Sequence, residues 1–542
     1  MRGGYAVVSK TSYDVVVVGY GMAGVTAAIE AAEAGARVLV LDRGYGGGAS
    51  ALSGGVVYAG GGTRYQRAAG LNDTPENMLN YLRQEVGGVV SEATLRRFCE
   101  TSASTIDWLE ENGATFRATL CPYKTSYPTD EHYLYYSGNE KAWPYVEHAE
   151  PAARGHRQVA KGMSSGHALF EVLRESAMRK GVAFQPLSRV ESLVIEDGRV
   201  LGLRYRTVDA DAPSMRRHQR LSKVAGKLGN WVPPIGARFN DKAEALWQTE
   251  AVEAEVRAGA VILSAGGFVF NPEMKAEHAG GFADISPLGT VGDDGTGIEL
   301  GLSAGGSAAH LDRMTAWRFM SPPAAFLEGV SVGPTGARIA NEDLYGATHS
   351  QVMIDKHQGR GFLVLDARQW KKARGQVRSQ TQPFQAAQAA YLFTVGHDKA
   401  ADLEALAKKI GVEPEGLART VAAYNDGLRS GSGDPAHKGP DLCSPVESGP
   451  FYAIDISIKN SPAFPAPGLT LGGLRVDEET GQVLTEDDQA ITGLYAAGRT
   501  AVGICTNSYL SGTSLADGIF SGRRAGLHAA SRVGAGPMAG AN

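Results

Sequence analysis

The strongest hydrophobic pattern of the chain lies near its start. A run of β-branched residues, Val15 to Val18, precedes a segment of small residues typical of a helix, Val25 to Ala34, and a second apolar run follows from Val38 to Leu41. Strand, helix and strand in this order form one βαβ unit, which predicts an α/β fold with a parallel sheet.

Further apolar patterns keep this character. The helix predicted after residue 513 carries Gly518, Gly522 and Gly526, one every four residues, which gives it a flat face for close packing. Other predicted helices start after 73–76 and cover 91–113 and 166–181, and predicted strands cover 182–184, 192–205 with a hairpin turn at Asp197-Gly198, 260–264 and 494–497.

Composition divides the chain into three stretches. We expect a first domain over 12–286, a separate globular insert over 287–444, and a return to the first domain over 445–542. With 542 residues, 43% of them hydrophobic, the chain is long enough for two or three domains. Residues 207–250 form a polar interruption of the first domain.

The turn between the first strand and the first helix is rich in glycine and reads G-Y-G-M-A-G over 19–24. In such a turn Gly19 permits a tight bend, Gly21 lets a pyrophosphate approach the backbone, and Gly24 lets the helix pack close to the strand. Asp42 follows about 20 residues on, where a carboxylate accepts from a ribose hydroxyl. The agreement of strand, helix, second strand and acid favours a dinucleotide site over a merely structural turn.

A second glycine-rich stretch follows the acid. Arg43 leads into a flexible run, 44–53, which continues into Gly54-Gly55. An NAD site would proceed to a third strand here, whereas a second glycine-rich loop fits a longer ligand such as FAD. The turn Ala265-Gly266-Gly267 after the strand of 260–264 also fits close approach of the backbone to a dinucleotide.

Residues 115–145 combine many aromatic side chains with Pro, Ser and Gly and show no clear period. Two interpretations stay open, packing within a surface loop and an aromatic wall over an apolar ligand. The aromatic residues are Tyr123, Tyr127, Tyr133, Tyr135, Tyr136, Trp143 and Tyr145.

Charge and cysteine usage limit the partners. A net charge of −5 and a pI near 6.2 argue against nucleic acid and strongly anionic partners. The four cysteines are scattered without a CxxC pair, so we predict reduced thiols and no metal site. Residues 1–10 lack the features of a secretory leader, and no apolar run reaches the roughly 18 residues of a membrane span, so we expect a cytoplasmic protein.

The middle of the polar interruption, 213–231, is basic and amphipathic. Such a helix either lies on a membrane or partner surface or packs as a solvated helix on its own domain, and we favour the second interpretation. Its basic residues are Arg216, Arg217, Arg220, Lys223 and Lys227, with no acidic residue among them.

Four segments, 19–42, 49–55, 261–268 and 493–526, together resemble the flavoprotein family of soluble fumarate reductases and 3-ketosteroid dehydrogenases. The resemblance runs over nearly the whole chain, with 207–250 as the obvious extra. It implies a Rossmann-like FAD-binding domain, split in sequence, with an inserted α+β cap domain and the substrate between cap and flavin.

The resemblance also implies which residues surround FAD. The last helix points its N-terminus at the flavin ring, so Ser514 and Leu515 should meet the ring through backbone groups. Covalent attachment requires a histidine near Gly48, and the first histidine is His132, so FAD should be non-covalent. The expected FAD-binding residues are Gly19, Gly21, Met22, Ala23, Gly24, Asp42, Arg43, Gly48, Ala49, Ser50, Ser53, Gly54, Gly55, Val190, Ala265, Gly266, Gly267, Asp293, Gly498, Arg499, Ser514 and Leu515.

Two departures separate the chain from the fumarate reductases. Those enzymes hold a dicarboxylate with histidine and arginine, and one arginine delivers the proton. Tyr509 stands at the place of that arginine, and the histidine has no counterpart in 469–473. Without these cations a pocket has little to hold two carboxylates.

The motif Y-x-S-G-T-S-L over 509–515 resembles instead the branch of 3-ketosteroid Δ4-(5α)-dehydrogenases, as does the Glu-Asp-x-Tyr segment at 342–345. The resemblance makes Tyr509 the base that removes the α proton while flavin N5 takes the β hydride. A phenol has an ordinary pKa of about 10 and needs help near neutrality, which Ser511, Tyr345 and a nearby helix N-terminus are expected to give. The Gly512 amide is expected to donate to the ketone oxygen.

Several alternatives remain at this point. Asn507-Ser508-Tyr509 is shared with the Δ1-dehydrogenase branch, whose following Pro-Gly-Pro-Gly is absent. A reductase of a small unsaturated acid would need a cationic pocket at Arg313, Arg318 or Arg499, and a non-catalytic flavin-binding protein would hold unreactive FAD. The electron acceptor is not predicted, because no NAD(P), haem or iron–sulfur motif is visible.

Overall fold

The computed structural model describes residues 12–209, 212–229, 233–282, 285–459, 461 and 464–534. The expectation about a leader in 1–10 and the end of the basic stretch, 230–231, lie outside the described residues. Among the described helices, none combines the length and the apolar character needed to cross a bilayer. Cys99, Cys121, Cys443 and Cys505, all within the described ranges, are free thiols.

A largely parallel sheet forms the centre of the first domain, in the order β19-β20-β9-β1-β2-β6. In the middle of the sheet Val17 lies opposite Val40 on one side and Ile262 on the other. The predicted βαβ unit is confirmed, although its helix begins at Met22. The elements are β1 (Tyr13–Val18), α1 (Met22–Glu33), β2 (Val38–Leu41), β6 (Ala183–Gln185), β9 (Val252–Leu263), β19 (Gln482–Leu484) and β20 (Ala490–Ala496).

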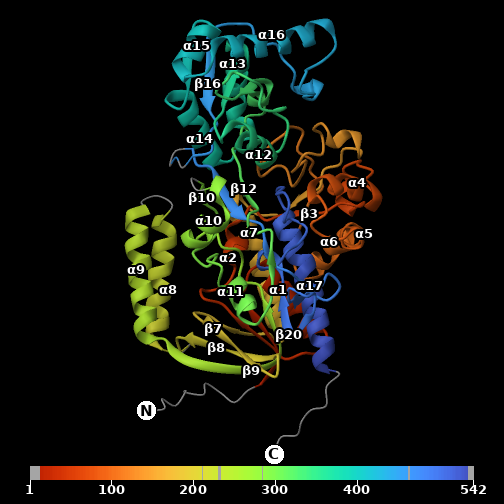
Figure 1. The fold of residues 1–542 in the computed structure, drawn as a ribbon, viewed down its shortest axis with the longest axis vertical. Helices are drawn as coiled ribbons and strands as arrows, with labels where there is room; N and C mark the ends of the chain where they lie inside the picture. Colours follow the sequence, from red (N-terminus) through yellow and green to blue (C-terminus); the bar gives the residue numbers. More distant parts are fainter. Residues whose placement is uncertain are drawn as a thin grey trace, which may run out of the picture.

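The last helix of the chain, α17 (Thr513–Gly534), packs along the first helix, α1 (Figure 1). A Cβ atom at Gly522 would lie 2.4 Å from the Ala23 carbonyl oxygen, and one at Gly526 would lie 2.3 Å from that of Ala27. The predicted flat glycine face is therefore confirmed, and it packs the last described helix against the first one beside the sheet.

The polar interruption of 207–250 forms a helical hairpin. Helices α8 (Pro213–Gly229) and α9 (Pro233–Glu250) pack against each other and stand beside the first domain (Figure 1). They connect the antiparallel strands β8 (Arg199–Thr207) and β9, whose last pair is Thr207 with Val252. The hairpin therefore enters and leaves the first domain at one point.

The inserted unit is built around a sheet of order β13-β14-β16-β15 and lies at the top of Figure 1. The strand over 451–455 belongs to this sheet, pairing with 362–365, so the boundary expected at 444 lies too early. Conversely, Ile298 and Leu300 belong to the core of the first domain, so the start expected at 287 also lies too early. Composition does not reveal which sheet a short strand joins.

The elements of this unit are β13 (Val330–Val332), α12 (Gly346–His357), β14 (Phe362–Leu365), α13 (Ala367–Gln380), α14 (Pro383–Thr394), β15 (Asp398–Ala400), α15 (Leu403–Ile410), α16 (Pro414–Ser430) and β16 (Phe451–Asp455). The remaining elements are α2 (Gly48–Leu52), β3 (Val56–Tyr58), α3 (Arg64–Ala68), α4 (Pro75–Val86), α5 (Glu92–Glu100), α6 (Ser102–Glu111), β4 (Leu134–Tyr135), β5 (Gly155–Arg157), α7 (Ser165–Arg179), β7 (Arg189–Glu196), α10 (Pro272–His278), β10 (Ser286–Pro287), α11 (Thr296–Ser303), β11 (Ala308–Ala309), β12 (Met314–Ala316), β17 (Pro467–Thr470) and β18 (Gly473–Leu474).

Candidate active site

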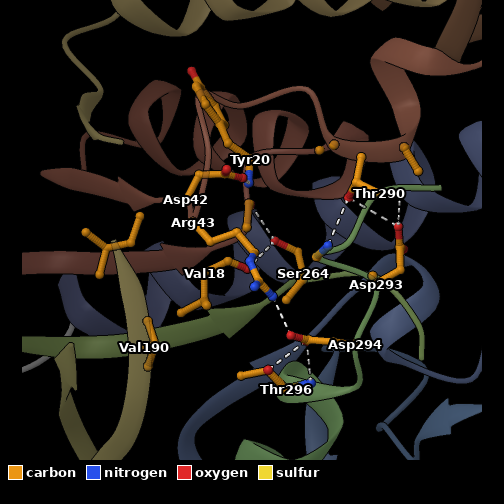
Figure 2. A pocket seen from close by; sticks show the side chains of 18 of the residues that line it. Val18, Tyr20, Asp42, Arg43, Val190, Ser264, Thr290, Asp293, Asp294 and Thr296 are labelled. Atoms are coloured by element: carbon orange, nitrogen blue, oxygen red, sulfur yellow. Dashed lines mark hydrogen bonds and ion pairs between the residues drawn. The ribbon is translucent and has the colours of Figure 1, made fainter. Parts of the chain in front are cut away.

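Two cavities adjoin each other, and the first lies at the carboxyl ends of the central strands. The first, of about 440 Å³, lies at the N-terminus of α1 (Figure 2), and the second, of about 290 Å³, lies between the inserted unit and the N-terminus of α17. Both are lined by Ala49, Ser50, Arg499 and Ser514. A molecule that fills the first cavity therefore meets whatever occupies the second.

Each glycine of the first turn occupies its position for a different physical reason. Gly19 has φ +95°, and a Cβ atom there would lie 2.6 Å from the Ser264 carbonyl oxygen, so the turn requires glycine. A Cβ atom at Gly24 would lie 2.0 Å from the Gly19 carbonyl oxygen, which is close helix–strand packing. A Cβ atom at Gly21 would have its nearest neighbour, Ser50 Oγ, at 3.5 Å. No protein atom demands glycine there, and the open space lets a ligand approach the backbone.

Polar groups converge on the rim of this turn. The Asp42 carboxylate accepts from the Tyr20 amide at 2.8 Å and from the Gly44 amide at 2.7 Å (Figure 2), and it lines the cavity. A carboxylate offers about four acceptor sites, so it can also accept from a ligand hydroxyl. At the N-terminus of α1, the Met22 amide donates to Ser50 Oγ at 3.0 Å.

Two buried donors fit an acceptor-rich ligand. Nη1 of Arg499 and Nε of Arg189 are buried and have no hydrogen-bond partner in the described part of the chain, and both residues line the first cavity. Nη2 of Arg499 pairs with Asp293 at 2.6 Å. Together with the positive end of α1, these donors suit the phosphates and ring acceptors of a dinucleotide. The residues present therefore fit FAD.

The expected FAD-binding residues separate into three groups. Ser53, Gly54 and Leu515 line the second cavity instead of the first. Gly24, Gly55 and Gly267 line neither cavity and serve close packing, since a Cβ atom at any of them would lie within 2.3 Å of another atom. The first cavity is lined by Gly19, Gly21, Met22, Ala23, Asp42, Arg43, Gly48, Ala49, Ser50, Val190, Ala265, Gly266, Asp293, Gly498, Arg499 and Ser514.

Two features of the first cavity differ from the sequence expectations. The stretch 44–53, expected to be flexible, contains the short helix α2, which the contact of Ser50 with α1 holds in place. Trp247 and Gln248 of α9 also line the cavity, although they lie in the polar interruption. The sequence signal that could have indicated this contribution was a tryptophan in an otherwise polar, charged segment.

The second cavity is apolar. Among the described residues that line it, Arg499 is the one charged side chain. Tyr127 contributes from the aromatic stretch of 115–145, and its hydroxyl donates to the Gly54 and Gly162 carbonyl oxygens at 3.0 Å. The side chains that form its wall include Trp317, Phe319, Tyr345, Phe384, Leu392, Phe464, Leu469, Tyr509 and Leu515.

Both interpretations of the aromatic stretch hold in part. Tyr127 belongs to the cavity wall, whereas Tyr133 and Tyr145 are buried in protein contacts and line neither cavity. The stretch is irregular apart from the two-residue strand β4 and the 3-10 turn that begins at Tyr145.

Tyr509 lies against a flat aromatic partner in the second cavity. Its ring stacks on that of Trp317 with centroids 5.1 Å apart and an interplanar angle of 9°, and the Tyr345 ring lies 6.4 Å away. Burial, with a smaller contribution from Cys505, raises the pKa of Tyr509 to about 12, while the charge of Arg499 acts in the opposite direction. Burial also raises the pKa of Tyr345. Among the described residues, Arg499 is the charged group that lowers the pKa of Tyr509.

The hydroxyl of Ser511 has a partner that the sequence did not indicate as a site residue. Ser511 Oγ and the Tyr135 hydroxyl are hydrogen-bonded at 2.8 Å, and Tyr135 is fully buried. The adjacent Gly512 has φ +99°, and its carbonyl oxygen accepts from the Tyr58 amide at 3.1 Å. This turn sets the entry into α17.

The glutamate of the Glu-Asp-x-Tyr segment has a structural role. Glu342 is fully buried, pairs with Arg338 at 2.6 Å and with Lys438 at 3.0 Å, and accepts from the Ser331 amide at 2.6 Å. These cations hold the pKa of Glu342 at about 2 despite burial. The segment is thus anchored at Glu342, and the amide of Tyr345 is fixed by the Asn139 side chain.

Two of the three arginines considered for a cationic pocket lie elsewhere. The buried guanidinium of Arg318 donates to the carbonyl oxygens of Ser457 and Phe464, and Arg313 donates to the Asn507 side chain at 3.0 Å. Neither lines the second cavity. A small dicarboxylate would find one cation there.

The comparisons with known proteins agree with this geometry. The sequence matches the FAD binding domain family over residues 14–515. It is 38% identical to the 3-oxo-5-alpha-steroid 4-dehydrogenase of Comamonas testosteroni over 494 residues, which cover 90% of this chain and 92% of the relative.

Two solved structures are similar in fold. The 3-ketosteroid-Δ4-(5α)-dehydrogenase of Rhodococcus jostii RHA1, in complex with 4-androstene-3,17-dione, has a TM-score of 0.80 and 32% identity over 98% of this chain and 100% of that chain. The open form of a flavocytochrome c3 fumarate reductase has a TM-score of 0.62 and 24% identity over 97% of this chain and 79% of that chain.

Proposed function

Because the chain belongs to the FAD-binding flavoprotein family, which it matches over residues 14–515, we propose that it is a dehydrogenase that introduces a C=C bond next to the ketone of a 3-ketosteroid, preferentially the 4,5 bond. One observation carries the proposal. Tyr509 lies flat against Trp317 in an apolar cavity that adjoins the FAD cavity. This arrangement suits a flat, apolar ketone.

The first cavity would hold FAD through residues already described. The N-terminus of α1 would meet the pyrophosphate, Asp42 a ribose hydroxyl, and the first-turn amides of α17 at Ser514 the flavin ring. FAD, when bound, supplies the hydride acceptor at N5. We propose that it is held non-covalently, because no histidine lies near Gly48.

The chain's own residues then handle the proton and the ketone. Tyr509 takes the proton from the carbon next to the ketone, and the Gly512 N–H donates to the ketone oxygen, where negative charge develops. Ser511 and its partner Tyr135 offer hydroxyls beside the reacting groups. The substrate loses one proton to Tyr509 and one hydride from the neighbouring carbon, which leaves the double bond. The apolar walls keep water away from the enolate.

The decisive test is anaerobic mixing of the purified, FAD-loaded protein with a saturated 5α-3-ketosteroid. We expect loss of the flavin absorbance and a 4-ene product, identified by chromatography and mass spectrometry. A 1-ene product would move the bond while keeping the mechanism. Failure of every 3-ketosteroid, together with reoxidation of the reduced protein by an unsaturated acid, would contradict the proposal.

A partner surface is a separate part of the proposal. The side chains of Arg216, Arg217, Arg220 and Lys223 on α8 are exposed, and their charge suits weak contact with an anionic membrane surface. We expect the protein to sediment with anionic vesicles at low salt and to be released at high salt. Absence of binding at low salt would remove this part.

A further inference from the structure

The α8–α9 hairpin takes part in the first cavity. Trp247 and Gln248 of α9 line it, beside Arg189 and Arg206 of the hairpin's neighbouring strands. This contribution comes from the segment that interrupts the first domain. The hairpin therefore forms part of the cavity wall.

Two guanidinium groups lie over the indole of Trp247. The Arg189 guanidinium lies 3.7 Å from a ring centroid of the indole and that of Arg206 lies 4.9 Å from one. The indole N–H donates to the Leu187 carbonyl oxygen at 2.8 Å, and the residue is 2% exposed. Cation–π contacts of buried tryptophan are among the stronger ones, so this stack is well fixed.

The position of the stack follows from its backbone neighbours. The Ser188 amide donates to the Asp42 carbonyl oxygen at 2.8 Å. The amide of Leu187, whose carbonyl oxygen accepts from the Trp247 indole, donates to the Gly44 carbonyl oxygen at 3.0 Å. Asp42 marks the ribose region, whereas the lining shared with the second cavity, including Ser514, marks the flavin end. Trp247 thus borders the adenosine end.

Contacts from both α8 and α9 hold the hairpin against the first domain at this place. Arg189 pairs with Glu244 of α9 at 2.5 Å, and the carboxylate of Glu244 has its pKa lowered to about 2 by this contact. On α8, the ring of His218 is hydrogen-bonded to the Tyr45 hydroxyl at 3.0 Å. Nε of Arg189 remains a buried donor without a partner in the described residues, next to the space a ligand would fill.

We propose that the α8–α9 hairpin is an FAD-retention element, which closes the adenosine end of the cavity through Trp247 and its cation–π contacts with Arg189 and Arg206. The inference rests on the proposal that FAD occupies the first cavity. It concerns the affinity for the adenosine half and leaves the chemistry at the flavin ring unchanged.

The test is cofactor binding to the apoprotein, measured by titration with FAD, ADP and FMN in turn. For Trp247→Ala we expect the dissociation constants of FAD and ADP to rise at least tenfold and that of FMN to stay within twofold. Gln219→Ala, an exposed change on α8, is the matched control and should bind all three as the parent protein does.

A second variant shows whether the effect of Trp247→Ala reflects a folding defect. Thr207 and Val252 are paired neighbours in β8 and β9, so a short glycine-rich turn can replace 209–250 while the strand ladder stays intact. It should weaken FAD and ADP at least as much as Trp247→Ala does. Unchanged ADP affinity in both variants, or an equal loss for FMN, would overturn the proposal. Neither outcome depends on steroid turnover.

Discussion

At the scale of single residues, the environment of the proposed base, Tyr509, combines two opposing requirements. Tyr509 lies in an apolar cavity that suits the substrate, and the same burial raises its pKa to about 12. Arg499 is the charge that opposes this rise, and it lines both cavities. The site therefore combines an apolar wall with one cation at the junction.

The pH dependence follows from this pKa. Below about 12 the phenol holds its proton, and the fraction able to act as base grows about tenfold for each pH unit. We expect the rate of anaerobic flavin reduction at subsaturating steroid to rise steadily from pH 7 to 10. Stopped-flow absorbance measures it. A flat profile would show that a group other than Tyr509 takes the proton.

Removing the phenolic hydroxyl tests the same residue directly. Tyr509→Phe keeps the ring that stacks on Trp317, so the protein should stay yellow with bound FAD. Turnover should fall about 10²–10⁴-fold, the usual contribution of a positioned base. Steady-state assays beside a flavin absorbance spectrum check both parts. Near-normal turnover would remove Tyr509 from the base role.

The sequence indicated some of these residues and missed others for physical reasons. Tyr509 and Gly512 lie in a contiguous motif at a helix start, and the resemblance of this motif to that of the 3-ketosteroid dehydrogenases indicated them. Tyr135 and Trp247 reach the two sites from segments distant in sequence, and no spacing rule connects them to Ser511 or Asp42. Their roles exist only once the chain has folded.

At the scale of elements, the glycine face of α17 sets how close this helix comes to α1. Gly522→Ala would place a Cβ atom 2.4 Å from the Ala23 carbonyl oxygen, whereas Gly518→Ala would make only ordinary contacts from 3.5 Å. We expect Gly522→Ala to cost about 1–3 kcal/mol and to weaken FAD binding through a displaced Ser514. Gly518→Ala should match or slightly exceed parent stability. Urea unfolding of the pair checks this, and equal stabilities would contradict it.

The anchor of the Glu-Asp-x-Tyr segment gives a second test. Glu342→Gln leaves Arg338 and Lys438 without their shared acid, which should cost about 3–5 kcal/mol at pH 7. The folded pKa of about 2 lies below the ordinary value, so the stabilisation is full above about pH 4.5 and fades as pH falls toward 2. Thermal melts of parent and variant should therefore converge in acid. Glu404→Gln, in an exposed pair on α15, is the control.

Sequence periodicity predicted most elements of the first domain, because its central strands and paired helices are long and strongly patterned. Composition, from which the domain boundaries were predicted, failed at the edges of the insert. The strand Phe451–Asp455 is short, and its membership of the insert's sheet depends on pairing with β14 and β15 from earlier in the chain.

At the scale of the whole molecule, the substrate cavity lies between the inserted unit and the first domain. Phe384 and Leu392 of α14 form one wall, and Tyr509 to Leu515 at the start of α17 form the other. A bound steroid should therefore slow hydrogen exchange in both segments together in the FAD-loaded protein. Mass spectrometry with and without a 4-ene-3-ketone measures this. Protection confined to one segment would place the steroid elsewhere.

The seat of α17 against α1 has a consequence for biosynthesis. The first helix is synthesised long before the glycine face that covers it and before Ser514, which lines the first cavity. The nascent chain consequently lacks this part of the cavity wall until α17 has been synthesised. We therefore expect a protein truncated before α17 to be purified without bound FAD.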